Sequence, residues 1–166
     1  MLEKILDEVN ESNKSRKTIS KMERREIDQF LIHSRVGRIG MSIEGSPYVV
    51  PVGYCYEDGE IFFHSCFSGL KMRSMARDPK VCFLVDESLS DGSMYKSVII
   101  YGTVEIIDDE ERMLPYLQNL INKYRVPVDF DEYISGPGRS REKEMAVVRV
   151  CVITPMEITS RKMIRV

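Results

Sequence analysis

The sequence predicts a mainly β fold in one domain, with antiparallel strands and flanking helices. Its 166 residues suit a single domain. Between residues 37 and 107, apolar and polar residues alternate with a period of two, and turn signals such as Glu44-Gly45-Ser46 and Asp58-Gly59 interrupt the alternation. Strands joined in this way, without regular strand–helix alternation, favour an antiparallel sheet or barrel over a doubly wound parallel sheet. We expect about six strands and three or four helices.

Two helices are expected near the N-terminus. Apolar residues recur at helical spacing over residues 1–10, which predicts a short amphipathic helix in an N-terminal extension covering 1–20. The main domain would then span 21–166. Ser20 and Glu23 have the spacing of a capping box, and a core-facing stripe follows, so a second helix is predicted over 21–33.

Five strands and one helix are expected through the middle of the chain. The brief helix would follow Ser68-Gly69 and end at Asp78-Pro79, because the residue before a proline disfavours helical geometry. The predicted helix covers 70–77, and the predicted strands cover 37–43, 48–56, 60–65, 80–85 and 96–107.

The last third of the chain predicts a helix, a connector and a strand. Asp108 and Glu111 form a second capping-box pair, which predicts a helix to Tyr124. Residues 125–143 contain two prolines and two glycines without clear periodicity, so we expect a mobile connector that could become ordered over a ligand. A final strand is predicted over 146–158.

Composition and charge exclude several classes of protein. The formal net charge is −2, from 24 basic and 26 acidic residues, whereas a general nucleic-acid binder is normally basic. The longest stretch without a formal charge, 45–56, is too short for a spanning helix and contains two prolines. Acidic residues interrupt the N-terminal region, so neither a signal peptide nor a transit peptide is readable, and we expect a cytoplasmic protein.

The cysteines predict free thiols and no metal site. Cys55, Cys66, Cys82 and Cys151 are far apart without a C-x-x-C pair, and buried free thiols are the favoured interpretation. His33 and His64 are the only imidazoles, so a zinc site would require distant residues to converge. A cysteine nucleophile paired with His64 remains an open alternative.

Residues 61–71 have the features of a phosphate-binding site. A strand end, a small-residue turn and a helix start follow one another here, and a helix N-terminus presents free N–H groups to an anion. Ser65 would add a hydroxyl donor, Lys71 a positive charge and Arg73 a planar fork. The alternative is that Lys71 and Arg73 only solvate a surface helix, and the spacing alone does not decide between the two.

Six short motifs follow one another in order along the chain. They are Arg35-Val36-Gly37-Arg38-Ile39-Gly40, Pro47-Tyr48-Val49-Val50-Pro51-Val52, Phe63-His64-Ser65, Gly69-Leu70-Lys71, Asp78-Pro79-Lys80-Val81 and Ser97-Val98-Ile99-Ile100-Tyr101-Gly102. Together these motifs resemble those of the pyridoxamine 5′-phosphate oxidase-like flavin proteins, and most closely the nitroimidazole-resistance type. The resemblance covers about residues 23–158.

The resemblance implies a six-stranded antiparallel split β-barrel that dimerises and binds one FMN in each of two clefts between the subunits. It assigns the FMN phosphate to Ser65 and Lys71, with Gly69 and Leu70 in the same motif. The remaining cofactor-binding residues that it implies are the backbone of Val50, Pro51 and Val52 along the isoalloxazine, Ser97 near the flavin, and Arg161 and Lys162 reaching the partner's flavin.

His64 would lie beside the flavin, where a neutral imidazole could hydrogen-bond a substrate or donate a proton. The implied activity is electron transfer from NADH or NADPH to a small acceptor such as a nitroaromatic or a quinone. The chain has no tryptophan and lacks the arginine-rich C-terminal signature of true pyridoxamine phosphate oxidases, so oxidation of that vitamin is not expected. Two alternatives remain open, a non-catalytic flavin-binding protein and a haem-binding protein that uses His33 or His64 as axial ligand.

Overall fold

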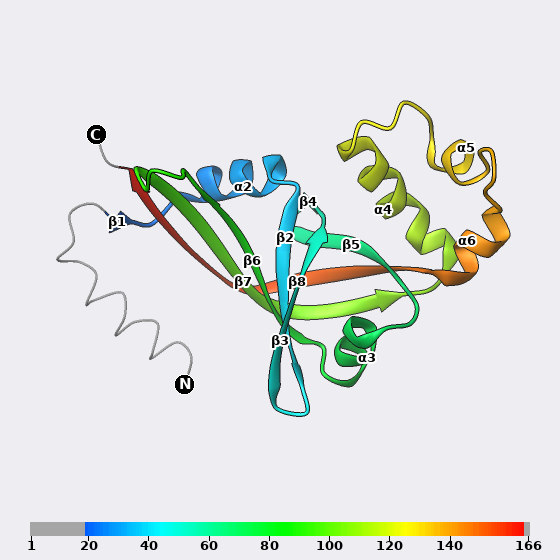
Figure 1. Cartoon of the computed structure of the whole chain (residues 1–166), viewed down its shortest axis with the longest axis horizontal. Coiled ribbons are helices and arrows are strands. Elements are labelled where there is room, and N and C mark those ends of the chain that lie inside the picture. The colour runs from blue at the N-terminus through cyan, green and yellow to red at the C-terminus, as the bar shows by residue number, and fades with distance from the viewer. Residues whose placement is uncertain (1–18, 165–166) are drawn as a thin grey trace.

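A single antiparallel sheet of eight strands forms the body of the protein in the computed structural model, which describes residues 19–164 (Figure 1). The strand order is β3-β2-β6-β7-β8-β5-β4, and β1 pairs with β8. The strands are β1 (Ile19–Ser20), β2 (Val36–Ile43), β3 (Ser46–Gly53), β4 (Cys55–Glu57), β5 (Glu60–Cys66), β6 (Lys80–Ser88), β7 (Met94–Ile107) and β8 (Val148–Ile164).

The sheet is strongly curved and open. Its end strands, β3 and β4, do not pair with each other in the described part of the chain, although the curvature brings β3 close to β5. The predicted mainly β, antiparallel fold is confirmed, and the predicted number of six strands is wrong. The two further strands are β1, which is only two residues long, and β4.

Tyr54 explains why the predicted strand 48–56 is two strands. Its ring is completely buried, its hydroxyl donates to the carbonyl of Leu31 at 2.8 Å, and its backbone N–H donates to the carbonyl of Arg35 at 3.3 Å. These bonds tie Tyr54 to the end of the preceding helix and to the loop after it. The pairing of β3 with β2 therefore ends before this residue, and the chain continues as β4, which pairs with β5.

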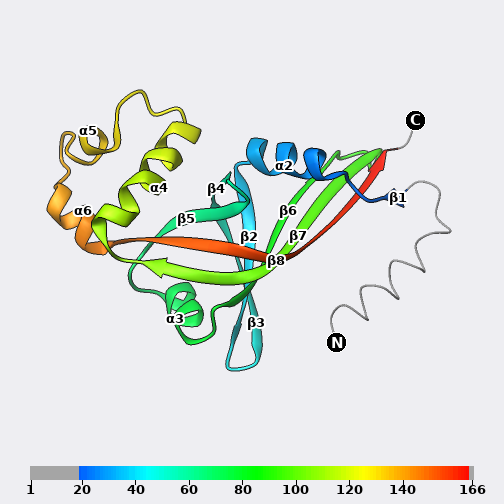
Figure 2. The same ribbon diagram turned by 180° about the vertical axis from the view of Figure 1, so that it is seen from behind.

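Within residues 19–164, five helices flank the sheet: α2 (Arg24–His33), α3 (Leu70–Arg77), α4 (Glu110–Lys123), α5 (Phe130–Ile134) and α6 (Arg141–Val147). Helices α4, α5 and α6 gather at one end of the long β7–β8 pair, and α3 lies on the other side of that pair, as Figure 2 shows from behind. In the described region, no helix is both long enough and apolar enough to cross a membrane.

Both predicted capping boxes are wrong. Ser20 pairs with Lys162 in the β1–β8 ladder, so α2 begins only at Arg24 and has no side-chain cap. The second helix start lies one residue later than predicted, because Asp109 rather than Asp108 accepts the N–H of Arg112 at 2.9 Å.

The region predicted as a mobile connector, 125–143, contains α5 and the first residues of α6. Asp129 caps α5 by accepting the N–H of Glu132, and Phe130 and Ile134 are buried against α4. The last strand consequently begins at Val148 and extends to Ile164, six residues beyond its predicted end. The helix predicted over 1–10 lies outside the described residues, as does most of the predicted extension 1–20.

Two hydrophobic cores share β5 and β8. One fills the inside of the curved sheet beneath α2 and α3, and the other lies between the sheet and α4, α5 and α6. Successive residues of β5 point to opposite faces, so Ile61 and Phe63 enter the first core while Phe62 enters the second. The two faces of β5 therefore look into two different environments, and this alternation positions the candidate site.

Candidate functional site

The junction between β5 and α3, residues 64–71, has the geometry of an anion site. Gly69 precedes α3 with φ of +118°, a conformation that L residues rarely adopt, and allows the chain to turn from the strand directly into the helix. No side chain caps α3. The N–H groups of its first turn are therefore available to a ligand, and the helix dipole favours a negative one.

Lys71 brings a positive charge to this junction. The residue is half-buried, with its ammonium nitrogen 5.3 Å from the centre of the Phe63 ring. Burial lowers the pKa of Lys71, because a charged ammonium loses hydration there. Within residues 19–164, no carboxylate comes within ion-pair distance of Lys71. A half-buried cation without an acidic partner at an uncapped helix start fits a bound phosphate.

Arg149 is a further cation at this junction that the sequence pattern did not predict. Ser65 and Arg149 are direct partners in the β5–β8 ladder, so both side chains lie on the same face of the sheet. The guanidinium donates to the carbonyls of Val148 at 2.6 Å and Ala146 at 3.2 Å, and lies 5.9 Å from the Phe67 ring. Only the pairing of β5 with β8 reveals this neighbour, since 84 residues separate the two in the chain.

His64 lies on the opposite face of β5 from Ser65, in a hollow on the side of α4, α5 and α6. His64 is an exposed residue. The surrounding protein nevertheless lowers the pKa of His64 by desolvation, and the charge of Lys71 lowers it further. The imidazole is therefore neutral at pH 7 and offers one donor and one acceptor nitrogen.

The predicted flavin-lining segment 50–52 lies on β3, an end strand of the sheet. Val52 is buried and Val50 packs against the core, whereas Pro51 is exposed. One side of the β3 backbone lacks a strand partner among the described residues, so its peptide groups can contact a ligand there. This arrangement suits a segment that would act through its backbone.

Comparisons with known proteins assign this chain to a family. The family model described as pyridoxamine 5′-phosphate oxidase matches residues 23–162. This chain belongs to that family. The resemblance predicted from its motifs is thereby confirmed.

Solved structures of similar proteins share the fold. A FAD-binding protein from Mesorhizobium loti is 23% identical, with coverage of 87% of this chain and 97% of the other and a TM-score of 0.66. A putative 5-nitroimidazole antibiotic resistance protein from Bacteroides thetaiotaomicron is 22% identical, with 87% of each chain covered and a TM-score of 0.70. A FAD and haem binding protein from Mycobacterium smegmatis is 18% identical, covering 90% of this chain and 74% of the other, with a TM-score of 0.67. No curated protein matches the chain.

The other three residues that the family resemblance implied lie far from the β5–α3 junction. Ser97 and Arg161 are direct partners in the β7–β8 ladder, and Ser97 lies ten residues along β7 from Ile107. Ile107 pairs with Val150, and Val150 also pairs with His64. The path along β7 from Ser97 to the level of His64 is therefore about 34 Å. Lys162 donates to Glu26 at 2.5 Å. One copy of the chain does not bring these residues to the junction.

The cysteines of this family member differ in burial. Cys55 and Cys151 are buried as predicted, Cys82 is half-buried, and Cys66 is exposed because it ends β5 where the chain leaves the sheet. Burial raises the pKa of Cys151 to about 12 and that of Cys55 to about 11, so both remain protonated thiols. In the described region no cysteine hydrogen-bonds His64, and no three His, Cys, Asp or Glu side chains group closely enough to hold a metal ion.

Proposed function

We propose that this member of the pyridoxamine 5′-phosphate oxidase family binds FMN at the β5–α3 junction and transfers electrons from NADH or NADPH to a small acceptor, such as a nitroaromatic or a quinone. The observation that carries the proposal is Lys71, a half-buried cation at the uncapped start of α3 that has no acidic partner among the described residues. Bound flavin would supply the redox chemistry by accepting two electrons from the nicotinamide and passing them on.

The residues of the junction have distinct roles in this proposal. Lys71 and Arg149 neutralise the phosphate, while Ser65 and the first N–H groups of α3, from Leu70 onward, donate hydrogen bonds to it. The backbone of 50–52 lies along the isoalloxazine. His64, neutral at pH 7, hydrogen-bonds the acceptor or gives it a proton. The similar protein described as FAD-binding supports flavin as the cofactor, and the one described as a 5-nitroimidazole antibiotic resistance protein supports a nitroaromatic acceptor.

We also propose that the chain acts as a homodimer with a flavin site at each subunit contact. Ser97 and Arg161 lie about 34 Å along β7 from the level of His64, so one copy does not bring them to the β5–α3 junction that would hold the phosphate. A twofold-related partner could supply them, since every contact in such a dimer occurs twice. A nicotinamide-dependent reductase with free thiols also suits the cytoplasm.

Cofactor identity is tested by the absorption spectrum of the purified protein and by mass analysis of the small molecule that acid releases from it. The site is tested by Lys71→Ala, which we expect to weaken FMN binding about 10- to 100-fold and riboflavin binding by less than about twofold, because only FMN carries the phosphate. Arg77→Ala is the matched control, since Arg77 is an exposed cation in the last turn of the same helix, away from the junction. Equal losses of FMN and riboflavin in Lys71→Ala would overturn the assignment.

Two alternative functions give different results in the same experiments. Steady oxidation of NADH or NADPH with an acceptor supports the reductase, whereas tight flavin without turnover supports a non-catalytic flavin-binding protein. An intense haem absorption band would transfer the proposal to haem and to its axial ligand, His33 or His64. That alternative is kept because one protein of the same fold binds both FAD and haem.

A further inference from the structure

A cavity lies on the other side of β5 from Lys71. A hollow of about 300 Å³ is enclosed by α4, α5, α6 and the adjoining ends of β5 and β8. Apolar side chains of α4 and α5 make up most of its wall, and His64 lines it from the sheet. This volume is at the lower end of the range for small-molecule sites, which are mostly apolar with a few polar groups.

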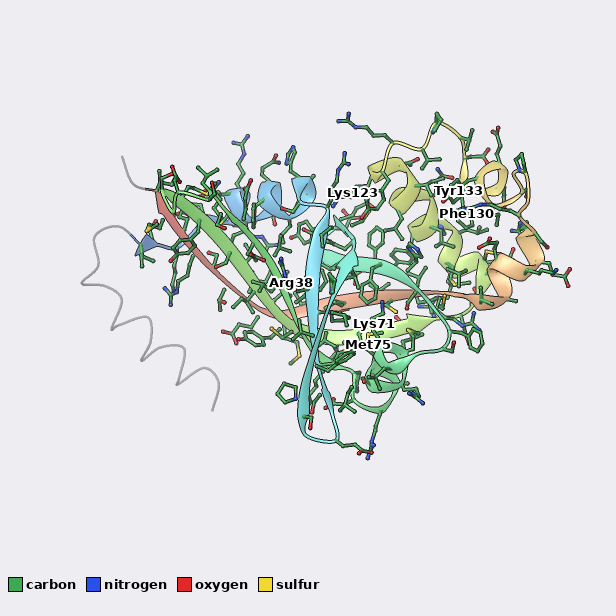
Figure 3. All side chains as sticks on the ribbon, viewed as in Figure 1. Arg38, Lys71, Met75, Lys123, Phe130 and Tyr133 are labelled. Carbon is green, nitrogen blue, oxygen red and sulfur yellow. The ribbon has the colours of Figure 1, made fainter. Side chains whose placement is uncertain are left out.

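Aromatic rings and one cation distinguish this cavity from an ordinary packing defect. Tyr124, Phe130 and Tyr133 contribute to its lining, and Figure 3 shows Phe130 and Tyr133 together at α5, well away from Lys71 and Met75. The Arg139 guanidinium lies 4.1 Å from the centre of the Tyr133 ring and donates to its hydroxyl at 3.2 Å. A rigid aromatic surface with a planar cation stacked on it suits a flat ligand.

His64 connects the cavity with the proposed flavin site. It is adjacent to Ser65 in β5, where alternate residues face opposite sides, so one residue faces the cavity and the next faces the phosphate side. A ligand in the cavity would therefore contact the imidazole that, in the proposed function, hydrogen-bonds or protonates the acceptor.

We propose that this cavity binds the electron acceptor, and that the acceptor is a planar aromatic molecule with an anionic substituent. The inference rests on the proposed function and adds to it where the acceptor binds and what chemistry selects it. Leu120, Phe130 and Tyr133 hold the ring system, Arg139 attracts the anionic group, and His64 contacts the reducible end. Glu144, the acidic residue of the lining, disfavours a ligand with a second anionic group.

The cavity is tested by filling it. Val126 lines the cavity and is half-buried, whereas Val128, also half-buried in the same loop, does not line it. We expect Val126→Trp to weaken binding of 1,4-naphthoquinone-2-sulfonate at least tenfold in calorimetric titration of the flavin-loaded protein, and Val128→Trp to change it less than twofold. Equal binding by the two variants would overturn the proposal.

The anionic group is tested by Arg139→Ala, with Lys143→Ala as an exposed control on α6. Arg139→Ala should weaken the sulfonated quinone about tenfold and unsubstituted 1,4-naphthoquinone less than twofold, because the latter lacks the charge. Equal effects on both quinones would contradict the proposed anion selectivity.

FMN titration of every variant separates the two proposals. If FMN binds normally and Val126→Trp leaves quinone binding unchanged, the cavity assignment fails alone. If the protein refuses FMN while the flavin-free chain binds the sulfonated quinone and Val126→Trp removes that binding, the proposed flavin function fails and the cavity remains a ligand site.

Discussion

His64 should make the protein less stable in mild acid. Its pKa lies below the ordinary value of 6.5, through desolvation and then through the charge of Lys71. Between the two values the unfolded chain binds more protons, so stability decreases as the pH falls from about 6.5 toward the folded-state pKa. We expect His64→Gln to lose less unfolding free energy than the wild type between pH 7.5 and pH 5 in urea titrations. An unchanged pH dependence would show that the imidazole ionises without cost in the folded protein.

Lys123 carries a buried ammonium group next to an aromatic ring. Its ammonium nitrogen lies 4.3 Å from the centre of the Tyr54 ring, and it is the single fully buried side-chain nitrogen or oxygen without a hydrogen-bond partner in the described region. Desolvation lowers its pKa below 10.5.

We expect Lys123→Met to stabilise the protein by about 1 kcal/mol at pH 7, because the charged group no longer has to be desolvated. The gain should shrink as the pH rises toward 10.5, where the folded wild type has already released this proton and its penalty. Urea unfolding at pH 7 and pH 9.5 measures both effects, with exposed Lys143→Met as control. A loss of stability in Lys123→Met would mean that the contact with Tyr54 outweighs the desolvation.

At the scale of elements, α4 depends on its N-terminal cap. Asp109 accepts the N–H of Arg112 at 2.9 Å, whereas Asp108 caps no helix in the described part of the chain. We expect Asp109→Ala to lower the free energy of unfolding by about 1 kcal/mol and Asp108→Ala to lower it by less than about 0.5 kcal/mol. Urea unfolding of both variants checks this difference. Equal costs would indicate that negative charge near the helix start, rather than the cap itself, stabilises α4.

At the scale of the whole molecule, the proposed dimer predicts complementation between two defective variants. Lys71→Ala damages the junction of its own chain, and Ser97→Trp would obstruct the site of the partner. In a mixed dimer one site receives both defects and the other receives neither. Equal mixing should therefore restore about one quarter of the wild-type flavin sites. Flavin absorbance after co-refolding and gel filtration measures this recovery. If the mixtures sediment as dimers but recover no flavin sites, Lys71 of one subunit and Ser97 of the other do not share a site.

Local features of the sequence predicted the elements whose causes are local. The helix 70–77 has the predicted bounds, and the buried stripe of Ile27, Phe30 and Leu31 follows from helical spacing. The Asp58-Gly59 turn takes positive φ at both residues, as a tight hairpin requires. Segment 61–71 contains the strand end and the helix start of the candidate anion site within eleven consecutive residues, so it too was readable.

Long-range pairing determined the rest. The partnership of Ser65 with Arg149, the break at Tyr54 and the cavity beneath α5 and α6 each depend on residues far apart in the chain. Periodicity shows which face of a strand is apolar, but it does not show which strand lies beside it or in which register. The sequence by itself therefore determined the fold class and indicated segment 61–71 as the candidate phosphate site. Only the tertiary structure decided that β5 presents Ser65 and His64 to two different surroundings, because that outcome depends on what packs against each face of the sheet.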